Sequence, residues 1–190
     1  MPQFDLRGMK VAQYVNTNGT ITYTNPQTVG DAMNVNLEMR FAEGRLYAES
    51  VLAEYLRKAI GGTISVGVKY IPTAAQKLMF GSTDKTRTVG GSSVTGLVLG
   101  GKSQGKYVGF SCYAPDMVDG VEKYTCIFAR KCLFGPPGYT LQTANESITF
   151  QTPTTSGEFL ADDSTDKNLL ETAVVDTEEQ AIAWVTAVLA

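Results

Sequence analysis

The sequence feature that most constrains the fold is the pair Asp119 and Gly120, which lies between two runs rich in aromatic and β-branched residues. A two-residue hairpin turn needs positive φ angles at its centre, and Asp and Gly tolerate them well. The flanking runs, residues 107–114 and 121–134, are therefore predicted to pair as a long antiparallel hairpin.

All three cysteines of the chain, Cys112, Cys126 and Cys132, fall in this hairpin. Counting outward from the turn places Cys112 opposite Ile127 and Cys126 opposite Tyr113, so Cys112 and Cys126 point to opposite faces. That placement disfavours a disulfide between them. We therefore expect buried, reduced thiols.

Strand signals continue along the chain. An Asn- and Gly-rich turn between two β-prone runs predicts a first hairpin over residues 10–24. Alternating or β-branched runs predict further strands at residues 35–41, 63–68 and 147–152. Residues 42–44 are expected to turn the chain back after the first of these, and Pro153 is expected to end the last. Residues 50–60 favour helix by propensity but lie between strands, so a helical turn or an irregular crossing is predicted there.

Two segments have clear helix signals. Pro72 at the start and Gly81 just past the end predict a short helix over residues 72–80. Near the C-terminus, Thr177 and Gln180 fit a capping box, and the helix that follows is expected to present an apolar stripe through Leu189.

Charge is uneven along the chain. Residues 1–157 hold 15 basic and 11 acidic side chains, whereas residues 158–190 hold one basic and eight acidic side chains. The run from residue 158 to residue 166 is therefore predicted to be an acidic linker. Neither part has the basic stripe of a protein that grips nucleic acid, and no apolar run is long enough for a membrane span.

The residue types needed for common catalytic chemistry are missing. The chain has no histidine, which excludes Ser-His-Asp, Cys-His and His-metal sites, and its cysteines lack paired C-x-x-C spacing. We therefore expect no catalytic site, no metal and no cofactor, and hence no enzyme.

One motif offers an alternative. Residues 96–103, Gly-Leu-Val-Leu-Gly-Gly-Lys-Ser, fit the phosphate-binding pattern G-x-x-x-x-G-K-[ST]. That chemistry needs a helix directly after the glycine loop, whereas the residues that follow here are typical of the start of a strand. A glycine-rich surface loop is the favoured interpretation, and a nucleotide-binding protein remains the alternative.

The order of several segments resembles the major tail proteins of long-tailed, non-contractile bacteriophages. The resemblance rests on Tyr-Val-Gly-Phe at 107–110, Val-Glu-Lys-Tyr at 121–124, Ser-Ile-Thr-Phe-Gln-Thr-Pro-Thr at 147–154, Leu-Tyr-Ala-Glu-Ser at 46–50, Gly-Gly-Thr-Ile-Ser-Val-Gly at 61–67 and the helix after residue 177. It implies hexameric rings that stack into a tail tube, which conducts the genome without sequence-specific DNA binding. It also implies a tape-measure protein and tail terminator and initiator proteins as partners, and location in the virion tail after assembly in the host cytoplasm. A tube component of a related contractile or secretion particle is the second possibility.

Together these signals predict a mainly β protein with minor α content, about seven or eight strands, and a sandwich or partly closed barrel of the tail-tube type. A single domain is expected, with an N-terminal arm at 1–9, a β core at 10–157 that contains a long loop at 81–105, and an acidic linker and helix at 158–190. The turn near residue 43 and the long loop are predicted to contact other subunits. The candidate contact residues are Phe41, Glu43, Gly44, Arg45, Lys85, Arg87 and Lys102.

Overall fold

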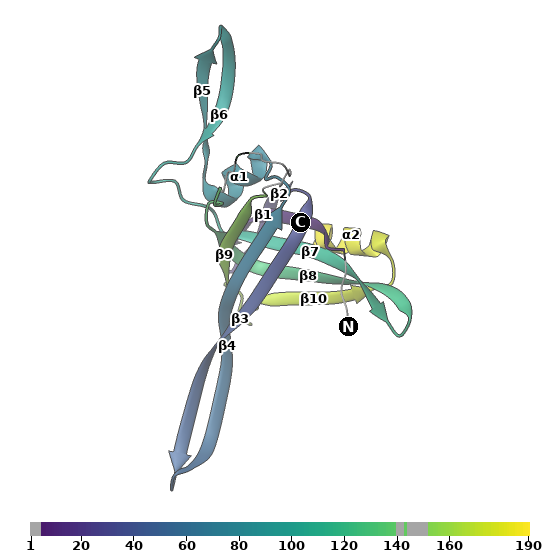
Figure 1. The fold of residues 1–190 in the computed structure, drawn as a ribbon. Coiled ribbons are helices and arrows are strands. Elements are labelled where there is room, and N and C mark those ends of the chain that lie inside the picture. The colour runs from purple at the N-terminus through teal and green to yellow at the C-terminus, as the bar shows by residue number, and fades with distance from the viewer. Residues whose placement is uncertain (1–4, 140–142, 144–151) are drawn as a thin grey trace.

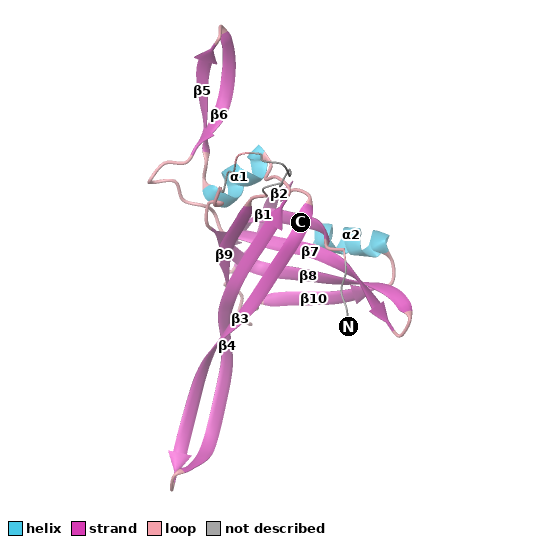
Figure 2. Ribbon diagram, viewed as in Figure 1, coloured by secondary structure: helices cyan, strands magenta, loops and turns pink. Residues whose placement is uncertain are grey.

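The computed structural model describes residues 5–139, 143 and 152–190, and it confirms a mainly β protein with two helices. The elements, shown in Figures 1 and 2, are β1 (Arg7–Thr17), β2 (Thr20–Thr28), β3 (Ala32–Ala48), β4 (Val51–Val68), α1 (Thr73–Phe80), β5 (Thr83–Val89), β6 (Ser92–Val98), β7 (Val108–Val118), β8 (Val121–Phe134), β9 (Thr154–Leu160), β10 (Leu170–Val175) and α2 (Glu178–Ala187).

Eight of these strands form one sheet, in the order β2-β1-β7-β8-β9-β4-β3, with β10 as an additional partner of β8. One edge of β8 pairs with β7. Its other edge is shared by β10, along residues 124–129, and by β9, along residues 131–134. The outermost strands of this order, β2 and β3, do not pair with each other, so the described strands do not close into a barrel.

Four hairpins turn through two residues that both have positive φ. The turn pairs are Asn18 and Gly19, Glu49 and Ser50, Gly90 and Gly91, and Asp119 and Gly120. The last pair confirms the predicted register, because Cys112 lies opposite Ile127 and Cys126 opposite Tyr113. All three cysteines are buried and free.

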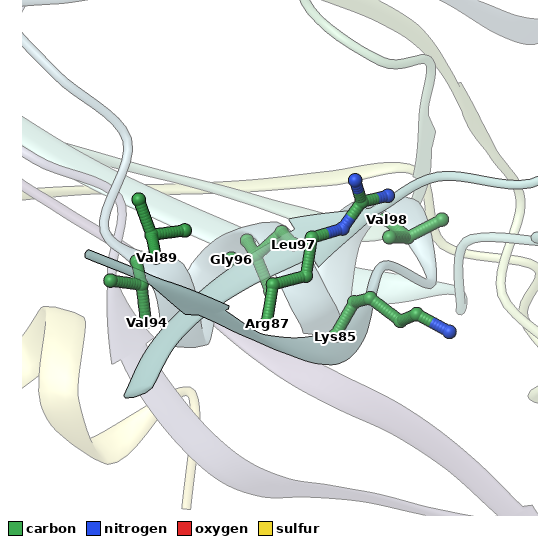
Figure 3. Close-up of a pocket in the computed structure, with 7 residues that line it drawn as sticks. All are labelled: Lys85, Arg87, Val89, Val94, Gly96, Leu97 and Val98. Atoms are coloured by element: carbon green, nitrogen blue, oxygen red, sulfur yellow. The ribbon is translucent and has the colours of Figure 1, made fainter. Parts of the chain in front are cut away.

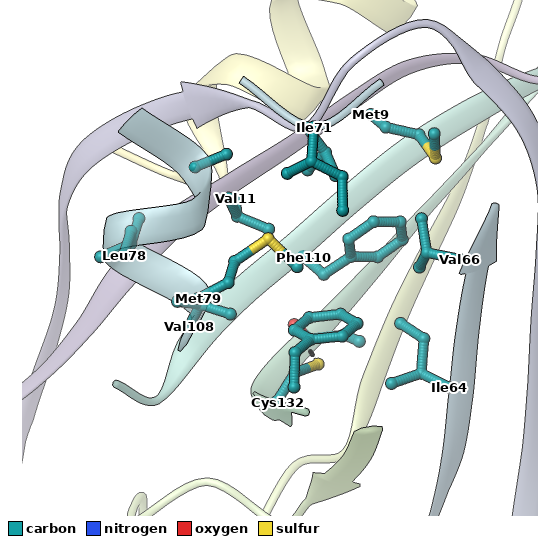
Figure 4. Packing of buried hydrophobic residues seen from close by; sticks show 14 of the residues in the cluster. Met9, Val11, Ile64, Val66, Ile71, Leu78, Met79, Val108, Phe110 and Cys132 are labelled. Atoms are coloured by element: carbon teal, nitrogen blue, oxygen red, sulfur yellow. Dashed lines mark hydrogen bonds between the residues drawn. The ribbon is translucent and has the colours of Figure 1, made fainter. Parts of the chain in front are cut away.

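The main core is formed by side chains of β1, β4, β7, β8 and β9 and is capped by α1. Phe110 of β7 packs among Ile64 and Val66 of β4 and Met79 of α1 (Figure 4). The short helix was predicted correctly: Pro72 precedes its first turn, Gly81 ends it in a left-handed conformation, and Ala75, Leu78 and Met79 are buried.

The opposite face of β7 and β8 is covered by α2. Ala181 and Val185 pack on Tyr113 and Cys126, and Ser111 donates a hydrogen bond of 3.1 Å from its hydroxyl to the carbonyl of Val185. Burial on both faces explains why β7 is buried along most of its length.

The ends of α2 differ slightly from prediction. Thr177 caps it as expected, but the side chain of Gln180 accepts from the N–H of Asp176, and the helix ends at Ala187. Ile182 is exposed, although its spacing from Val185 and Leu189 places it on the same apolar stripe.

The prediction of an acidic linker at residues 158–166 was only partly right, because residues 161–166 lie in the loop between β9 and β10. Glu158 belongs to β9, and Asp162 is buried. Six carboxylates of residues 158–190 pair with basic side chains from earlier in the chain, as Arg40–Glu158, Arg130–Asp162, Lys131–Asp163, Arg130–Glu171, Lys123–Asp176 and Arg7–Glu178. The uneven charge along the sequence is therefore largely neutralised inside one subunit.

Three other predictions were wrong. Residues 42–44 do not turn, because β3 continues to Ala48 and the turn is at Glu49 and Ser50. Residues 50–60 are strand, because pairing with β3 overrides their helix propensity. Most of the expected loop at 81–105 is the hairpin of β5 and β6.

Two predictions, the N-terminal arm at residues 1–9 and the strand at residues 147–152, fall only partly within the described residues. Residues 1–4 lie outside the described residues, and β1 begins at Arg7, inside the expected arm. The strand predicted at 147–152 falls almost entirely outside the described residues. The next strand, β9, begins directly after Pro153.

Candidate interaction surfaces

Two hairpins project from the body of the molecule in opposite directions (Figure 1). We call residues 41–59 the long arm; they are the distal parts of β3 and β4. We call residues 83–98 the upper hairpin; it is formed by β5 and β6, which pair only with each other among the described strands. All of the predicted contact residues except Lys102 lie on these two hairpins.

One face of the long arm carries a ladder of charged and aromatic side chains. The guanidinium of Arg57 lies 3.7 Å from the ring centroid of Phe41, and its Nε is 3.5 Å from a carboxylate oxygen of Glu43. Arg45 lies 3.4 Å from the other oxygen of Glu43 and 5.6 Å from the ring centroid of Tyr55. Phe41 and Glu43 therefore both contact Arg57, and Glu43 also pairs with Arg45. The charged groups of this face thus already have partners within the subunit.

The other face of the long arm is apolar and open. Gly44 lies opposite Leu56, and Leu46 lies opposite Glu54. Leu56 is 72% exposed, and a Cβ added at Gly44 would meet nothing within 4 Å. These residues line a shallow open groove to which Arg45 also contributes.

The upper hairpin has one basic and apolar face. Its register places Lys85 opposite Gly96 and Arg87 opposite Val94. These four residues and Val89, Leu97 and Val98 line an open groove of about 260 Å³ (Figure 3). Asp84 forms an ion pair with Lys77 of α1, whereas Lys85 and Arg87 form none with any described residue. The groove therefore has two uncompensated positive charges beside valine side chains.

Lys102 lies apart from both hairpins, in a turn closed by hydrogen bonds between Gly100 and Ser103. This turn ends the pattern at residues 96–103. Residues 96–98 are the last part of β6, and residues 104–107 lie in neither helix nor strand before β7 begins. The helix that the phosphate-binding pattern requires is thus not present within the described part of this segment.

Sequence reasoning missed most of the exposed apolar side chains of the long arm. They are Leu46, Tyr47, Val51, Leu52, Tyr55 and Leu56. Because both faces of the arm are outside the core, no apolar alternation marks it as a strand. The helix propensity of residues 50–60 also pointed away from a strand, so no sequence signal identified this hairpin.

The groups with shifted pKa values lie in the body of the molecule. Burial raises the pKa of Cys112 to about 12, while hydrogen bonds from Lys131 and Tyr14 lower the pKa of Asp163 to about 2. Within the described ranges, no group of three His, Cys, Asp or Glu side chains could hold a metal ion, and neither helix could cross a membrane.

Neither protein-family models nor curated protein sequences match this chain. The two hairpins and the charges around them are the features of the described residues that bear most directly on its function.

Proposed function

We propose that this protein is a structural subunit that self-assembles into stacked rings and so forms a tail tube for genome delivery. The observation that carries the proposal is the pair of exposed hairpins that project from opposite ends of the subunit (Figure 1). The order of sequence segments that resembles phage major tail proteins adds the ring, the tube and their biological setting.

The exposed apolar surface of the long arm favours contact with another protein. Leu46, Val51 and Leu56 are each more than half exposed. Isolated two-stranded hairpins are marginally stable in water, and contiguous apolar patches usually mark contact sites. Packing against a neighbouring subunit would both cover these side chains and hold the hairpin in place.

The opposite directions of the two hairpins favour an open assembly. A contact that joins different surfaces of two copies leaves one of each surface free at the ends of the pair. Further copies can add at both ends, so such contacts build a stack. This property suits rings that extend into a tube, with tail terminator and initiator proteins at its ends.

The charge distribution is compatible with a conduit for DNA and a tape-measure protein. Five basic side chains of the body pair with carboxylates of residues 158–190, and the net charge of the chain is −3. Tight non-specific DNA binding depends on many free Lys and Arg side chains that neutralise phosphates. A wall with few free positive charges would allow DNA to pass without retaining it.

The test is electron microscopy of the purified full chain with light scattering over a range of concentrations. We expect hollow tubes of uniform width. In one variant, Asn-Gly replaces residues 85–96. Asp84 and Leu97 face each other across the upper hairpin, so a two-residue Asn-Gly turn can join them directly. In a second, Asn-Gly replaces residues 43–57 between the facing residues Ala42 and Lys58.

Both shortened variants should remain folded by circular dichroism and form no tubes. Ile182→Ser is the matched control, because it removes an exposed apolar side chain from α2, outside both hairpins. Wild-type protein that stays monomeric at every concentration would contradict the tube. Tubes from either shortened variant would show that its hairpin is not an assembly contact.

A further inference from the structure

We infer that the tip of the long arm of one copy binds the grooved face of the upper hairpin of a second copy, head to tail. The inference rests on the proposed function, which it deepens by assigning the partner of each hairpin. Three properties of the two surfaces support it: their charge, their shape and their direction.

The distal parts of the two hairpins carry opposite charges that no ion pair with a described residue of the same subunit compensates. Residues 46–56, at the tip of the long arm, include Glu49 and Glu54 and no basic residue. Residues 85–98 of the upper hairpin include Lys85 and Arg87 and no acidic residue. None of these four side chains forms an ion pair with another described residue of its own subunit. Two negative charges on one hairpin can therefore meet two positive charges on the other.

The neighbouring charges do not cancel this match. On the long arm, Arg45 is held by Glu43 and Tyr55. Lys58 lies nearer to the core, since it pairs with Ala42, four register positions before the pair of Leu46 and Glu54. On the upper hairpin, Asp84 is neutralised by Lys77 at the base. The distal part of each hairpin thus keeps a single sign of charge.

The apolar shapes of the two faces are also complementary. Each face has a glycine that leaves open space: a Cβ added at Gly44 or at Gly96 would meet nothing within 4 Å. Leu46 and Leu56 lie beside Gly44, and Val94 and Val98 lie beside Gly96. The leucines of one copy can occupy the groove over Gly96 while the valines of the other occupy the groove over Gly44.

The directions of the hairpins decide the kind of contact. Because they project from opposite ends of the subunit, one copy cannot bring its own long arm to its own upper hairpin (Figure 1). Each copy instead offers one acidic tip and one basic groove to two different neighbours. Such contacts join successive copies in one direction and do not close on a pair.

Charge reversal provides the test. The first variant, Lys85→Glu with Arg87→Glu, has acidic side chains on both hairpins. The second, Glu49→Lys with Glu54→Lys, has basic side chains on both. All four positions are exposed, so both variants should fold as the wild type does by circular dichroism.

Each variant alone should fail to polymerise at concentrations where wild-type protein forms tubes, as measured by light scattering and electron microscopy. An equimolar mixture should polymerise again, because each acidic hairpin then finds a basic one on the other variant. A chain with all four reversals should also polymerise. Lys167→Glu is the control, since it reverses an exposed charge outside both hairpins.

The outcomes separate the contact from the tube. Tubes formed by either double variant alone would overturn the pairing of the hairpins and leave the tube intact. Association of the mixture into chains without hollow tubes, measured by sedimentation, would keep the pairing and overturn the tube. Wild-type protein and mixture that both remain monomeric would overturn both proposals.

Discussion

Arg130 donates a hydrogen bond of 2.6 Å from its Nε to Oδ2 of Asp162, whose side chain is completely buried. The other oxygen of this carboxylate accepts from the backbone N–H groups of Ser164 and Asn168. Burial by itself would raise the pKa of Asp162, but the hydrogen bonds from Ser164 and Arg130 lower it below its ordinary value. This carboxylate therefore joins the loop between β9 and β10 to β8.

Replacing this carboxylate should destabilise the fold. Asp162→Asn leaves Arg130 without its buried partner and presents an amide to backbone donors, and loss of one member of a buried pair costs about 3 kcal/mol. We expect the urea midpoint of unfolding to fall accordingly. Asp166→Asn is the control, because Asp166 is exposed. Equal stability of the two variants would show that the Asp162 contacts contribute little.

Acid should remove the same contribution in the wild-type protein. The pKa values of Asp162 and Asp163 are lowered in the folded state from 3.8, that of Asp163 to about 2. Their stabilising contribution is therefore complete above about pH 4 and is lost as the pH falls towards 2. The free energy of unfolding, measured with urea at pH 7 and at pH 3, should fall less between these two pH values for Asp162→Asn than for wild type. The same loss in both proteins would contradict this assignment.

Gly62 should tolerate no side chain. A Cβ at this position would overlap the carbonyl oxygen of Glu38 and the ring of Phe159, which is fully buried in β9. Overpacking of this kind costs about 1–3 kcal/mol, so Gly62→Ala should lower the melting temperature by several degrees. Gly44→Ala, also in the β3–β4 hairpin but facing open space, should melt as the wild type does.

Substitutions in the turn of the long arm should stabilise the arm. Glu49 and Ser50 have φ angles of 51° and 66°, a conformation that costs residues with a Cβ about 1–2 kcal/mol each and that Asn-Gly adopts readily. Glu49→Asn with Ser50→Gly should slow hydrogen exchange of the arm amides about fivefold or more. The matched double substitution, Gly90→Ala with Gly91→Ala, should speed hydrogen exchange of the amides in the upper hairpin. Unchanged exchange in both variants would exclude strain in these turns.

Turn chemistry decides how much of the fold could be predicted from the sequence. Asp119 and Gly120 set the register of β7 and β8 because few other residue pairs form such a turn so readily, and Pro72 and Gly81 marked α1 for similar reasons. Glu49 and Ser50 give no such signal, since neither favours positive φ. Without a recognisable turn, the helix propensity of residues 50–60 was the strongest remaining information, and it pointed to the wrong structure.

The candidate contact residues were predictable to a similar extent. Phe41, Glu43, Gly44 and Arg45 do lie on a projecting element, although in mid-strand, and Lys85 and Arg87 line a groove. The acidic tip was missed because its position depends on where the arm turns. Lys102 was chosen for its place in a supposed loop that the pairing of β5 with β6 largely replaces.

The shared edge of β8 also sets the time at which a subunit is complete. A chain leaves the ribosome from its N-terminus, and β8 appears before β9, β10 and α2, which pair with its edge or cover Phe128 and Cys126. The edge therefore lacks a partner until β10 has been synthesised, and the face lacks its cover until α2 and Leu189 follow. The long arm emerges much earlier, so its apolar tip is available to partners before the body that carries it has finished folding.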